Sequence, residues 1–329
     1  MSRIAALGEM LVDLVATAAG VTLTEAPSFA PAAGGAPANV AVGVARLGGK
    51  GSFLGKFGDD PWGHFLSRTL EENGVDIQGI RFTGEARTAL AFVALMEHGE
   101  RDFVFYRHPS ADMLYAPDEV DAAVIAGATI LHHGSISLIT EPSRSATLRA
   151  IDLARQHGCL ISYDPNLRLP LWPDEATART TILETMPGAH YAKVSEDELT
   201  FLTGETEVLR GAERLWHADM RLLSITRGSG GCSYVAASGS GHVDGFSVQC
   251  VDTTGAGDGW VAALLTQLAQ NPDLWADRVA LEQALRYANA AGALTTTKRG
   301  AIPALPTPDQ IDALMRTAGV MPVTGEFDG

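Results

Sequence analysis

Val251-Asp252-Thr253-Thr254-Gly255-Ala256-Gly257-Asp258-Gly259 is the stretch that decides the fold, because it stands directly before the apolar run from Trp260 to Leu268. The run is typical of a buried helix, which we expect over Ala256–Gln270. Small residues at a helix start leave backbone N–H groups uncovered, and the helix dipole adds to their attraction for an anion. The stretch therefore predicts a phosphate cradle at the start of a helix.

Asp258 lies among these uncovered donors and has two interpretations. As a residue of the first helical turn, it would cap the helix and be stabilised by the helix dipole. As a general base, its carboxylate would face the place where a transferred phosphoryl group develops charge. The Gly-Ala-Gly-Asp sequence alone does not decide between the two.

A second glycine cluster, Gly34-Gly35-Ala36-Pro37-Ala38-Asn39, precedes apolar residues at helical spacing, such as Val40 and Val44. Pro37 suits the first turn of a helix, where a missing N–H costs nothing. Two glycines let the backbone approach a ligand closely, and Asn39 offers a donor and an acceptor to a hydroxyl group. A tight turn that leads into a helix would use the same residues, so both interpretations stay open.

After about residue 128 the sequence alternates short apolar runs with helical stretches. We expect strands at Ala128–His132, Cys159–Tyr163, His190–Val194 and Arg221–Thr226. We expect helices at Glu141–His157, Asp174–Met186, Ser195–Thr203, Val208–His217 and Ala280–Thr297. Such alternation is typical of an α/β fold with a parallel sheet covered on both faces, which binds ligands outside the carboxyl ends of its strands.

The first hundred residues differ, because two extended runs, Thr88–Glu97 and Arg101–Tyr106, flank His98-Gly99-Glu100. This arrangement predicts a β-hairpin with a short loop. A second extended piece is expected from Leu11 to Phe29, and the two together would form a small sheet that projects as a lid. A small sheet with one apolar face tends to pair across a two-fold axis, so we expect a homodimer joined through its lids. The tail from Val320 to Gly329 is expected to be frayed.

The composition excludes several classes of partner. Lys and Arg number 24 against 39 Asp and Glu, a net charge of −15, and no run of like charges indicates a nucleic-acid surface or a basic membrane patch. The apolar runs are shorter than the ~18 residues of a membrane span, and neither a P-loop nor a dinucleotide fingerprint occurs. Three widely spaced cysteines and a start without a secretory cleavage site predict a cytoplasmic protein with buried thiols. Small molecules are the expected partners.

The two glycine motifs together resemble a known family. GGAPANVA (34–41) and DTTGAGD (252–258), about two hundred residues apart, are similar to the two signatures of the ribokinase-like (PfkB) carbohydrate kinases. Four further stretches resemble the fructokinase branch: RDFVFYRHPSADML (101–114), HGSISLI (133–139), SYDPNLRLPLW (162–172) and KRGAIPALP (298–306). The resemblance implies a single kinase domain over residues 1–329, with a three-layer α/β/α core and a small β-sheet lid inserted from about 12–33 and 83–109.

The resemblance also implies chemical roles. Asp258 would deprotonate the sugar hydroxyl that attacks the γ-phosphate, and the backbone N–H groups of Gly255, Ala256 and Gly257 would form the anion hole. The residues implied to approach the sugar or the transferred phosphate are Asp13, Gly34, Gly35, Asn39, Arg107, Asn166 and Arg168. A turn would account for Asp13, and solvated surface charges would account for the arginines, without any ligand.

Nucleotide and ion sites follow from the same resemblance. The loop of Thr226, Gly228 and Gly231 resembles the nucleotide loop of the family, although a hairpin connection would need the same glycines. Asn289 would line the adenine pocket or pack between helices.

Glu198 matches the glutamate that orients water around Mg²⁺, but Ser195 stands where the family has asparagine, so the metal role rests mainly on Glu198. An acidic first helical turn is the alternative interpretation of this segment. A monovalent cation, K⁺, is implied near Asp252 and Thr254.

These expectations converge on an ATP-dependent sugar kinase that uses Mg²⁺ and phosphorylates D-fructose at its primary 6-hydroxyl. The alternative within enzymes is a 2-keto-3-deoxygluconate kinase, whose acidic substrate would use additional cationic contacts. A catalytically inactive sugar-binding regulator of the same fold is the alternative outside enzymes, and the substitution at Ser195 is its only support.

Overall fold

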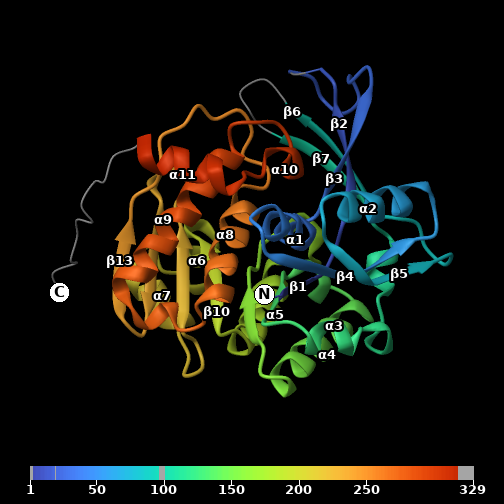
Figure 1. Ribbon diagram of the computed structural model, residues 1–329. Helices are drawn as coiled ribbons and strands as arrows, with labels where there is room; N and C mark the ends of the chain where they lie inside the picture. Colours follow the sequence, from blue (N-terminus) through green and yellow to red (C-terminus); the bar gives the residue numbers. More distant parts are fainter. Residues whose placement is uncertain (1–2, 19, 96–100, 318–329) are drawn as a thin grey trace.

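Two β-sheets of unequal size organise the chain in the computed structural model, which describes residues 3–18, 20–95 and 101–317 (Figure 1). The larger sheet has nine strands and the smaller has four. The hairpin loop expected at residues 98–100 and the tail expected from Val320 to Gly329 lie outside the described residues. The smaller sheet stands at one edge of the layered body that the larger sheet forms.

The larger sheet has the strand order β13-β12-β11-β10-β9-β8-β1-β4-β5. Its strands are β1 (Arg3–Leu7), β4 (Lys50–Gly58), β5 (Asp76–Thr83), β8 (Ile130–His133), β9 (Leu160–Tyr163), β10 (Tyr191–Ser195), β11 (Leu222–Thr226), β12 (Cys232–Ala236) and β13 (Gly239–Val243). In this spatial order, all neighbouring strands from β11 through β1 to β5 pair in parallel. Among the described strands of this sheet, only the β11–β12 and β12–β13 pairs are antiparallel. The mostly parallel sheet is confirmed, and its strands deliver their carboxyl ends to one edge.

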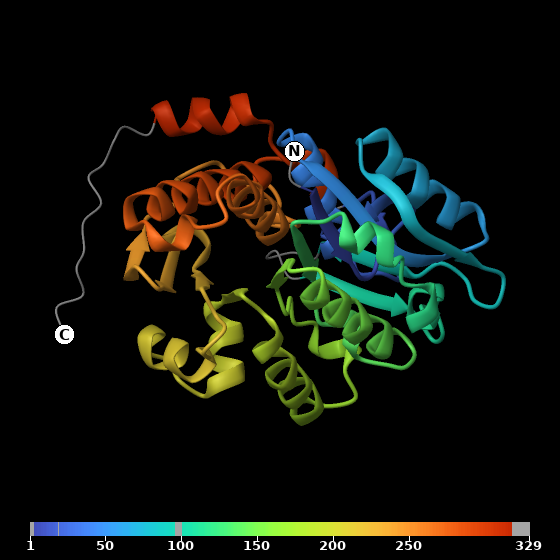
Figure 2. The same ribbon diagram turned by 60° about the horizontal axis from the view of Figure 1, so that its bottom comes forward.

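Helices cover both faces of this sheet, with the late helices on one side and the middle ones on the other (Figure 2). One face carries α1 (Ala36–Arg46), α2 (Pro61–Glu72), α8 (Ala256–Gln270), α9 (Arg278–Thr295), α10 (Ala301–Ala304) and α11 (Pro308–Thr317). The other face carries α3 (Ala122–Ala126), α4 (Ser143–Gln156), α5 (Glu175–Thr185), α6 (Glu196–Thr203) and α7 (Val208–Leu215). The three-layer core is therefore confirmed, and each expected strand and helix after residue 128 lies within three residues of its expected bounds.

Strand β1 illustrates why the strands are apolar throughout. Ile4 packs in the cluster under α8 and α9, whereas Ala5 and Leu7 pack in the cluster under α3 and α4. Successive side chains of a strand point to opposite faces, and both faces of this sheet are buried. A polar side chain in such a strand is therefore costly unless it has a partner or a function.

The smaller sheet has the order β3-β2-β6-β7, with β2 (Leu11–Ala16), β3 (Phe29–Gly34), β6 (Leu90–Leu95) and β7 (Arg101–Tyr106). β6 and β7 pair antiparallel, which confirms the expected hairpin, and β2 pairs in parallel with β6. Rings of Phe29, Phe92 and Tyr106 form an aromatic row across the sheet, with centroids 5.1 and 5.4 Å apart.

The extended piece expected from Leu11 to Phe29 is wrong in its middle, because the chain turns back between β2 and β3. The Glu25 carboxylate accepts hydrogen bonds from the N–H (3.1 Å) and the hydroxyl (2.8 Å) of Thr22. The Ala26 N–H donates to the Thr22 carbonyl at 3.1 Å. These local hydrogen bonds close a turn that apolar alternation does not reveal.

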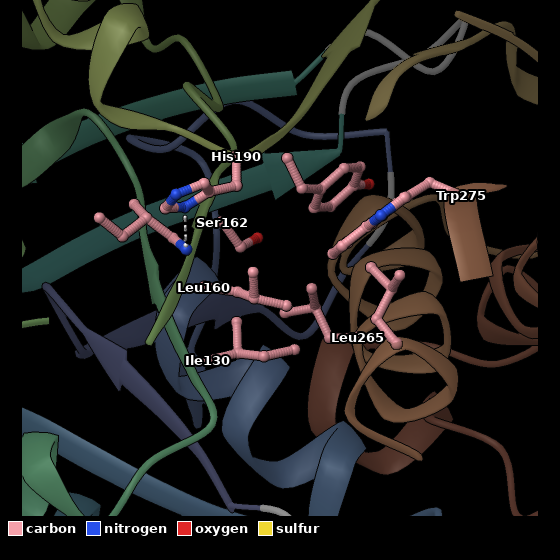
Figure 3. A pocket seen from close by; sticks show the side chains of 9 residues that line it. Ile130, Leu160, Ser162, His190, Leu265 and Trp275 are labelled. Atoms are coloured by element: carbon pink, nitrogen blue, oxygen red, sulfur yellow. Dashed lines mark hydrogen bonds between the residues drawn. The ribbon is translucent and has the colours of Figure 1, made fainter. Parts of the chain in front are cut away.

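An apolar pocket lies at the amino ends of β9 and β10, away from the edge where the parallel strands of the larger sheet end (Figure 3). Leu160, Leu265 and Trp275 line it, and the Ile161 N–H donates to Nδ1 of His190 at 3.0 Å. Its walls come from the sheet and from α8 and the turn that follows, so we assign the pocket to the packing of α8 on the sheet.

The expectation that the cysteine thiols are buried is wrong for one of the three cysteines. Cys159 and Cys232 are buried, but Cys250 is exposed, since it lies in the irregular segment before α8. Within the described part of the chain, none of the helices combines the length and the hydropathy that a membrane crossing needs.

Candidate active site

Helix α8 begins as the cradle motif predicts. Gly255 adopts a left-handed conformation (φ 79°) at the helix start, and the Ala256 N–H donates to the Thr253 carbonyl at 3.2 Å. The N–H groups of Gly257 and Asp258 follow in the first turn, where a helix has no carbonyl of its own to accept them. The start of α8 thus offers backbone donors to an anion.

Asp258 is buried on this first turn, and its carboxylate faces α1. The Asn39 side-chain amide donates to its Oδ2 at 2.7 Å. The N-cap residue of α8 is Gly255, which has no side chain to cap the helix, and the Asp258 carboxylate accepts from Asn39 of α1. Burial raises the pKa of Asp258, while the hydrogen bond from Asn39 and the charges of Lys193 and Arg168 oppose the rise. A carboxylate with a raised pKa is a better proton acceptor near neutral pH than a free one.

The glycine pair brings Asp13 and α1 together. A Cβ on Gly34 would lie 2.3 Å from Oδ2 of Asp13, so the carboxylate of β2 rests directly on the Gly34 backbone. Gly35 has φ 117° and a Cβ there would lie 2.6 Å from the Glu9 carbonyl oxygen. The Asn39 N–H donates to the Gly35 carbonyl at 2.9 Å. Asp13, the glycines, Asn39 and Asp258 therefore form one continuous group of contacts.

A buried cluster of charges completes this side of the site. Arg107 and Asp112 form a buried ion pair, and the Ser110 hydroxyl donates to Oδ1 of Asp112 at 2.5 Å. Glu9 is also buried, and its Oε1 accepts from the Ala36 N–H at 3.3 Å. Burial raises the pKa of Glu9 to about 7, although the positive charge of Arg107 opposes this.

Three polar atoms of this region have no hydrogen-bond partner among the described residues: Oε2 of Glu9, Oδ1 of Asn39 and Nε of Arg107. Buried polar atoms are otherwise almost always paired, so these atoms are available to the hydroxyl groups of a ligand. Sequence reasoning missed Glu9. The signal was an acidic residue two positions after the end of the apolar strand β1, at the ligand-binding edge.

The segment after β9 supplies a further group. Asp164 and Lys193 form a buried ion pair, which sequence reasoning also missed. Asn166 has φ 45°, and its N–H donates to Oδ1 of Asp164 at 3.1 Å. Arg168 is exposed, and its charge opposes the rise in the pKa of Asp258. The structure thus places Asn166 beside the buried pair, and Arg168 follows in the exposed part of the same segment.

Glu198 connects this segment to the start of α6. Its Oε1 accepts from the Leu167 N–H and its Oε2 from the Ser195 N–H, both at 2.7 Å, and the Ser195 hydroxyl accepts from the Glu198 N–H at 3.1 Å. The capping box with Ser195 uses Oε2 and the contact with Leu167 uses Oε1, so both carboxylate oxygens accept hydrogen bonds from the chain. In the described ranges no group of three His, Cys, Asp or Glu side chains could hold a metal. Mg²⁺ keeps several waters and is held largely by substrate phosphates, so Glu198 fits a role through water.

The proposed nucleotide loop connects β11 to β12. Gly228 and Gly231 have φ 56° and 88°, and the Arg227 N–H donates to the Gly231 carbonyl at 2.8 Å. Thr226 ends β11, and its hydroxyl donates to the Val194 carbonyl at 3.5 Å. The loop is a hairpin connection, and it lies at the carboxyl end of β11.

Asn289 is buried in α9 with its side-chain amide engaged. Its Oδ1 accepts from Nε1 of Trp260 at 2.7 Å, and its Nδ2 donates to the carbonyls of Val243 (2.9 Å) and Asp244 (3.1 Å). These contacts match the packing interpretation, and they fix the chain that leaves β13.

Asp252 and Thr254 lie in the loop before α8. Oδ1 of Asp252 accepts from the N–H (3.0 Å) and the hydroxyl (2.6 Å) of Thr254, and its Oδ2 accepts from the Gly300 N–H at 2.9 Å. The carboxylate therefore joins the two loops that flank the cradle.

The chain is similar to known proteins over nearly its whole length. The profile of the pfkB family carbohydrate kinases matches residues 1–308. A probable fructokinase-4 of Arabidopsis thaliana is 52% identical over 316 residues, which cover 96% of this chain and 97% of that protein. A crystal structure of fructokinase with bound ATP from Xylella fastidiosa superposes with a TM-score of 0.89 at 35% identity, covering 96% of this chain and 98% of that one.

A fructokinase from Vibrio cholerae O395, crystallised with fructose, ADP and calcium, superposes with a TM-score of 0.85 at 36% identity, covering 95% of this chain and 99% of that one. Profile, sequence and structure agree, and the chain belongs to the pfkB family of carbohydrate kinases.

Proposed function

We propose that this sugar phosphotransferase is an ATP-dependent fructokinase, which transfers the γ-phosphoryl group of ATP to the 6-hydroxyl of D-fructose. The hydrogen bond between Asn39 and Asp258 carries the proposal, because it brings the base at the anion cradle to the glycine pair. Similarity to fructokinases, one of them crystallised with fructose and ADP, supports the substrate.

In the proposed reaction Asp258 accepts the proton of the 6-hydroxyl while the hydroxyl oxygen forms a bond to the γ-phosphorus. The bond from that phosphorus to the bridging oxygen of ADP breaks, and ADP leaves with its electron pair. Asp13, Glu9 and Arg107 would hold the other hydroxyls, and the Gly255–Gly257 N–H groups would stabilise charge on the phosphoryl oxygens. When bound, Mg²⁺ neutralises charge on the ATP phosphates.

Three further residues are proposed at the ions. Glu198 would orient water around Mg²⁺ from the start of α6, and Asp252 and Thr254 would flank a K⁺ ion held largely by carbonyl oxygens. Thr226, Gly228 and Gly231 would lie against the nucleotide, with Asn289 behind them.

We place the reaction in the cytoplasm, where unpaired cysteines stay reduced, and cell fractionation would test this.

A coupled ADP-release assay with fructose, glucose, ribose, adenosine and 2-keto-3-deoxygluconate tests the substrate. Fructose should give the highest kcat/KM, and the product should carry phosphate on its 6-hydroxyl. Phosphate at the 1-position, or preference for the keto acid, would contradict the fructokinase assignment. No turnover with any sugar, despite sugar binding, would favour the regulator.

The four-stranded sheet is proposed to act as a lid, with segments from about 12–33 and 83–109 closing over the sugar before transfer. A kinase must keep water from the γ-phosphate, and closure of a small element achieves this. Saturating fructose should therefore slow hydrogen exchange of the β6 and β7 amides. Unchanged exchange in both strands, with or without an ATP analogue, would refute the lid.

The lid is also proposed to join two copies in a homodimer. Val104 and Tyr106 on β7 are 42% and 62% exposed and lie on one face of the strand. Pairing two such faces would bury both side chains. Sedimentation should give a dimer, and Val104→Glu should shift it toward monomer; a monomeric wild type at assay concentration would rule the dimer out.

A further inference from the structure

Lys193 and Asp164 form a buried ion pair at the ligand-binding edge of the larger sheet. Nζ of Lys193 lies 2.9 Å from Oδ2 and 3.1 Å from Oδ1 of Asp164, and the two side chains are 7% and 5% exposed. Asp164 directly follows β9 and Lys193 lies in the neighbouring strand β10. Buried ion pairs are often no more stabilising than apolar residues of similar volume, so stability alone does not explain this pair.

The ammonium group faces the anion cradle. A Cβ on Gly257 would lie 3.4 Å from Nζ of Lys193, and because Gly257 carries no side chain, this space stays open. The ammonium has three N–H donors, and the two oxygens of Asp164 take two. The positive charge of Lys193 also opposes the rise in the pKa of Asp258, so the ammonium and the base are electrostatically close.

We propose that Lys193 is a phosphate ligand, which donates a hydrogen bond from Nζ to an oxygen of the γ-phosphoryl group during transfer. Asp164 is the positioning residue that holds the ammonium beneath Gly257. The inference rests on the proposed kinase function. Lys193 approaches the cradle from the buried side, with Nζ 3.4 Å from a Cβ placed on Gly257, so its charge compensates the charge that develops on the phosphoryl oxygens. No proton leaves Lys193 in this step.

The test uses a double variant, Lys193→Met with Asp164→Asn, which removes both charges. Lys193→Met alone would strand a buried carboxylate and could unfold the protein. The matched control is Arg3→Met with Asp76→Asn, an ion pair of 2.7 Å at the opposite edge of the sheet. Thermal unfolding establishes that both variants are folded. Calorimetry then measures the binding of ADP and of a non-hydrolysable imido analogue of ATP, and steady-state assays measure kcat.

In the Lys193→Met/Asp164→Asn variant, affinity for the ATP analogue should fall roughly tenfold or more while ADP affinity changes little, since ADP lacks the γ-phosphoryl group. The kcat should fall roughly 10²-fold, as for loss of one donor to a transition-state oxyanion. Wild-type values in a folded double variant would overturn the proposal, and equal losses for ADP and the analogue would overturn the γ-phosphoryl assignment. If the wild type phosphorylates no sugar, the proposed function fails, but the two affinities still decide the role of Lys193.

Discussion

Replacing Asp258 with asparagine should lower kcat by roughly 10²–10⁴-fold, the range for removal of a positioned general base. The fold should survive, because asparagine has the same size and its amide oxygen can still accept from Asn39, which now donates at 2.7 Å. Nucleotide affinity should also survive, because the cradle is made of backbone N–H groups.

The pH dependence of activity should also change when Asp258 is replaced. A base acts when ionised, and burial raises the pKa of Asp258, so wild-type activity should fall as pH decreases through that raised pKa. The Asp258→Asn variant should lack this acid limb.

A matched control is Asp277→Asn, since Asp277 caps α9 by accepting from the Val279 and Ala280 N–H groups. The Asp277→Asn variant should be less stable than wild type by about 1 kcal/mol at most, and its kcat should equal that of wild type. Turnover of Asp258→Asn within a few-fold of wild type would show that another group accepts the proton.

Gly34→Ala should fold and yet lose sugar affinity. The added methyl group would lie 2.3 Å from Oδ2 of Asp13, so the carboxylate has to leave its place on the Gly34 backbone. The side chain of Asp13 is the part that can move, and Gly34 does not have a left-handed backbone, so we expect little strain. Losing one hydrogen bond to a charged group costs about 1.5–3 kcal/mol. The KM for fructose should accordingly rise roughly 10- to 10²-fold, while that for ATP stays close to wild type.

Two comparisons make this result specific. Gly84→Ala places its methyl group where nothing lies within 4 Å, and it should behave as wild type. Asp13→Ala should reproduce the fructose defect, and combining it with Gly34→Ala should add little, because both changes remove the same contact. A wild-type KM for fructose in Gly34→Ala would remove Asp13 from the sugar site.

Four neighbouring strands of the larger sheet, β8 to β11, could be predicted from sequence, since they are short apolar runs bounded by helices with clear periodicity. The turn around Thr22 and Glu25 could not, because it depends on side-chain hydrogen bonds within an otherwise extended segment. Local pattern also gave no sign that Cys250 is exposed.

Only the part of the candidate site that lies in local sequence motifs could be predicted from the sequence. Asp258 and the glycines lie in motifs whose local geometry is encoded by neighbouring residues. Lys193 meets Asp164 only through the pairing of β10 with β9, and Glu9 meets the Ala36 N–H only where the start of α1 folds back beside it. Their signal in the sequence was a single charge in or after an apolar strand, which burial makes costly without a partner.

The bond between Asn39 and Asp258 spans 219 positions of the chain. The glycine pair and the small sheet therefore leave the ribosome long before Asp258 and the start of α8 are synthesised. A nascent chain that ends before α8 contains the residues proposed to bind the sugar, but it lacks Asp258 and the proposed anion cradle. The proposed site is therefore complete only late in synthesis, when α8 docks on α1.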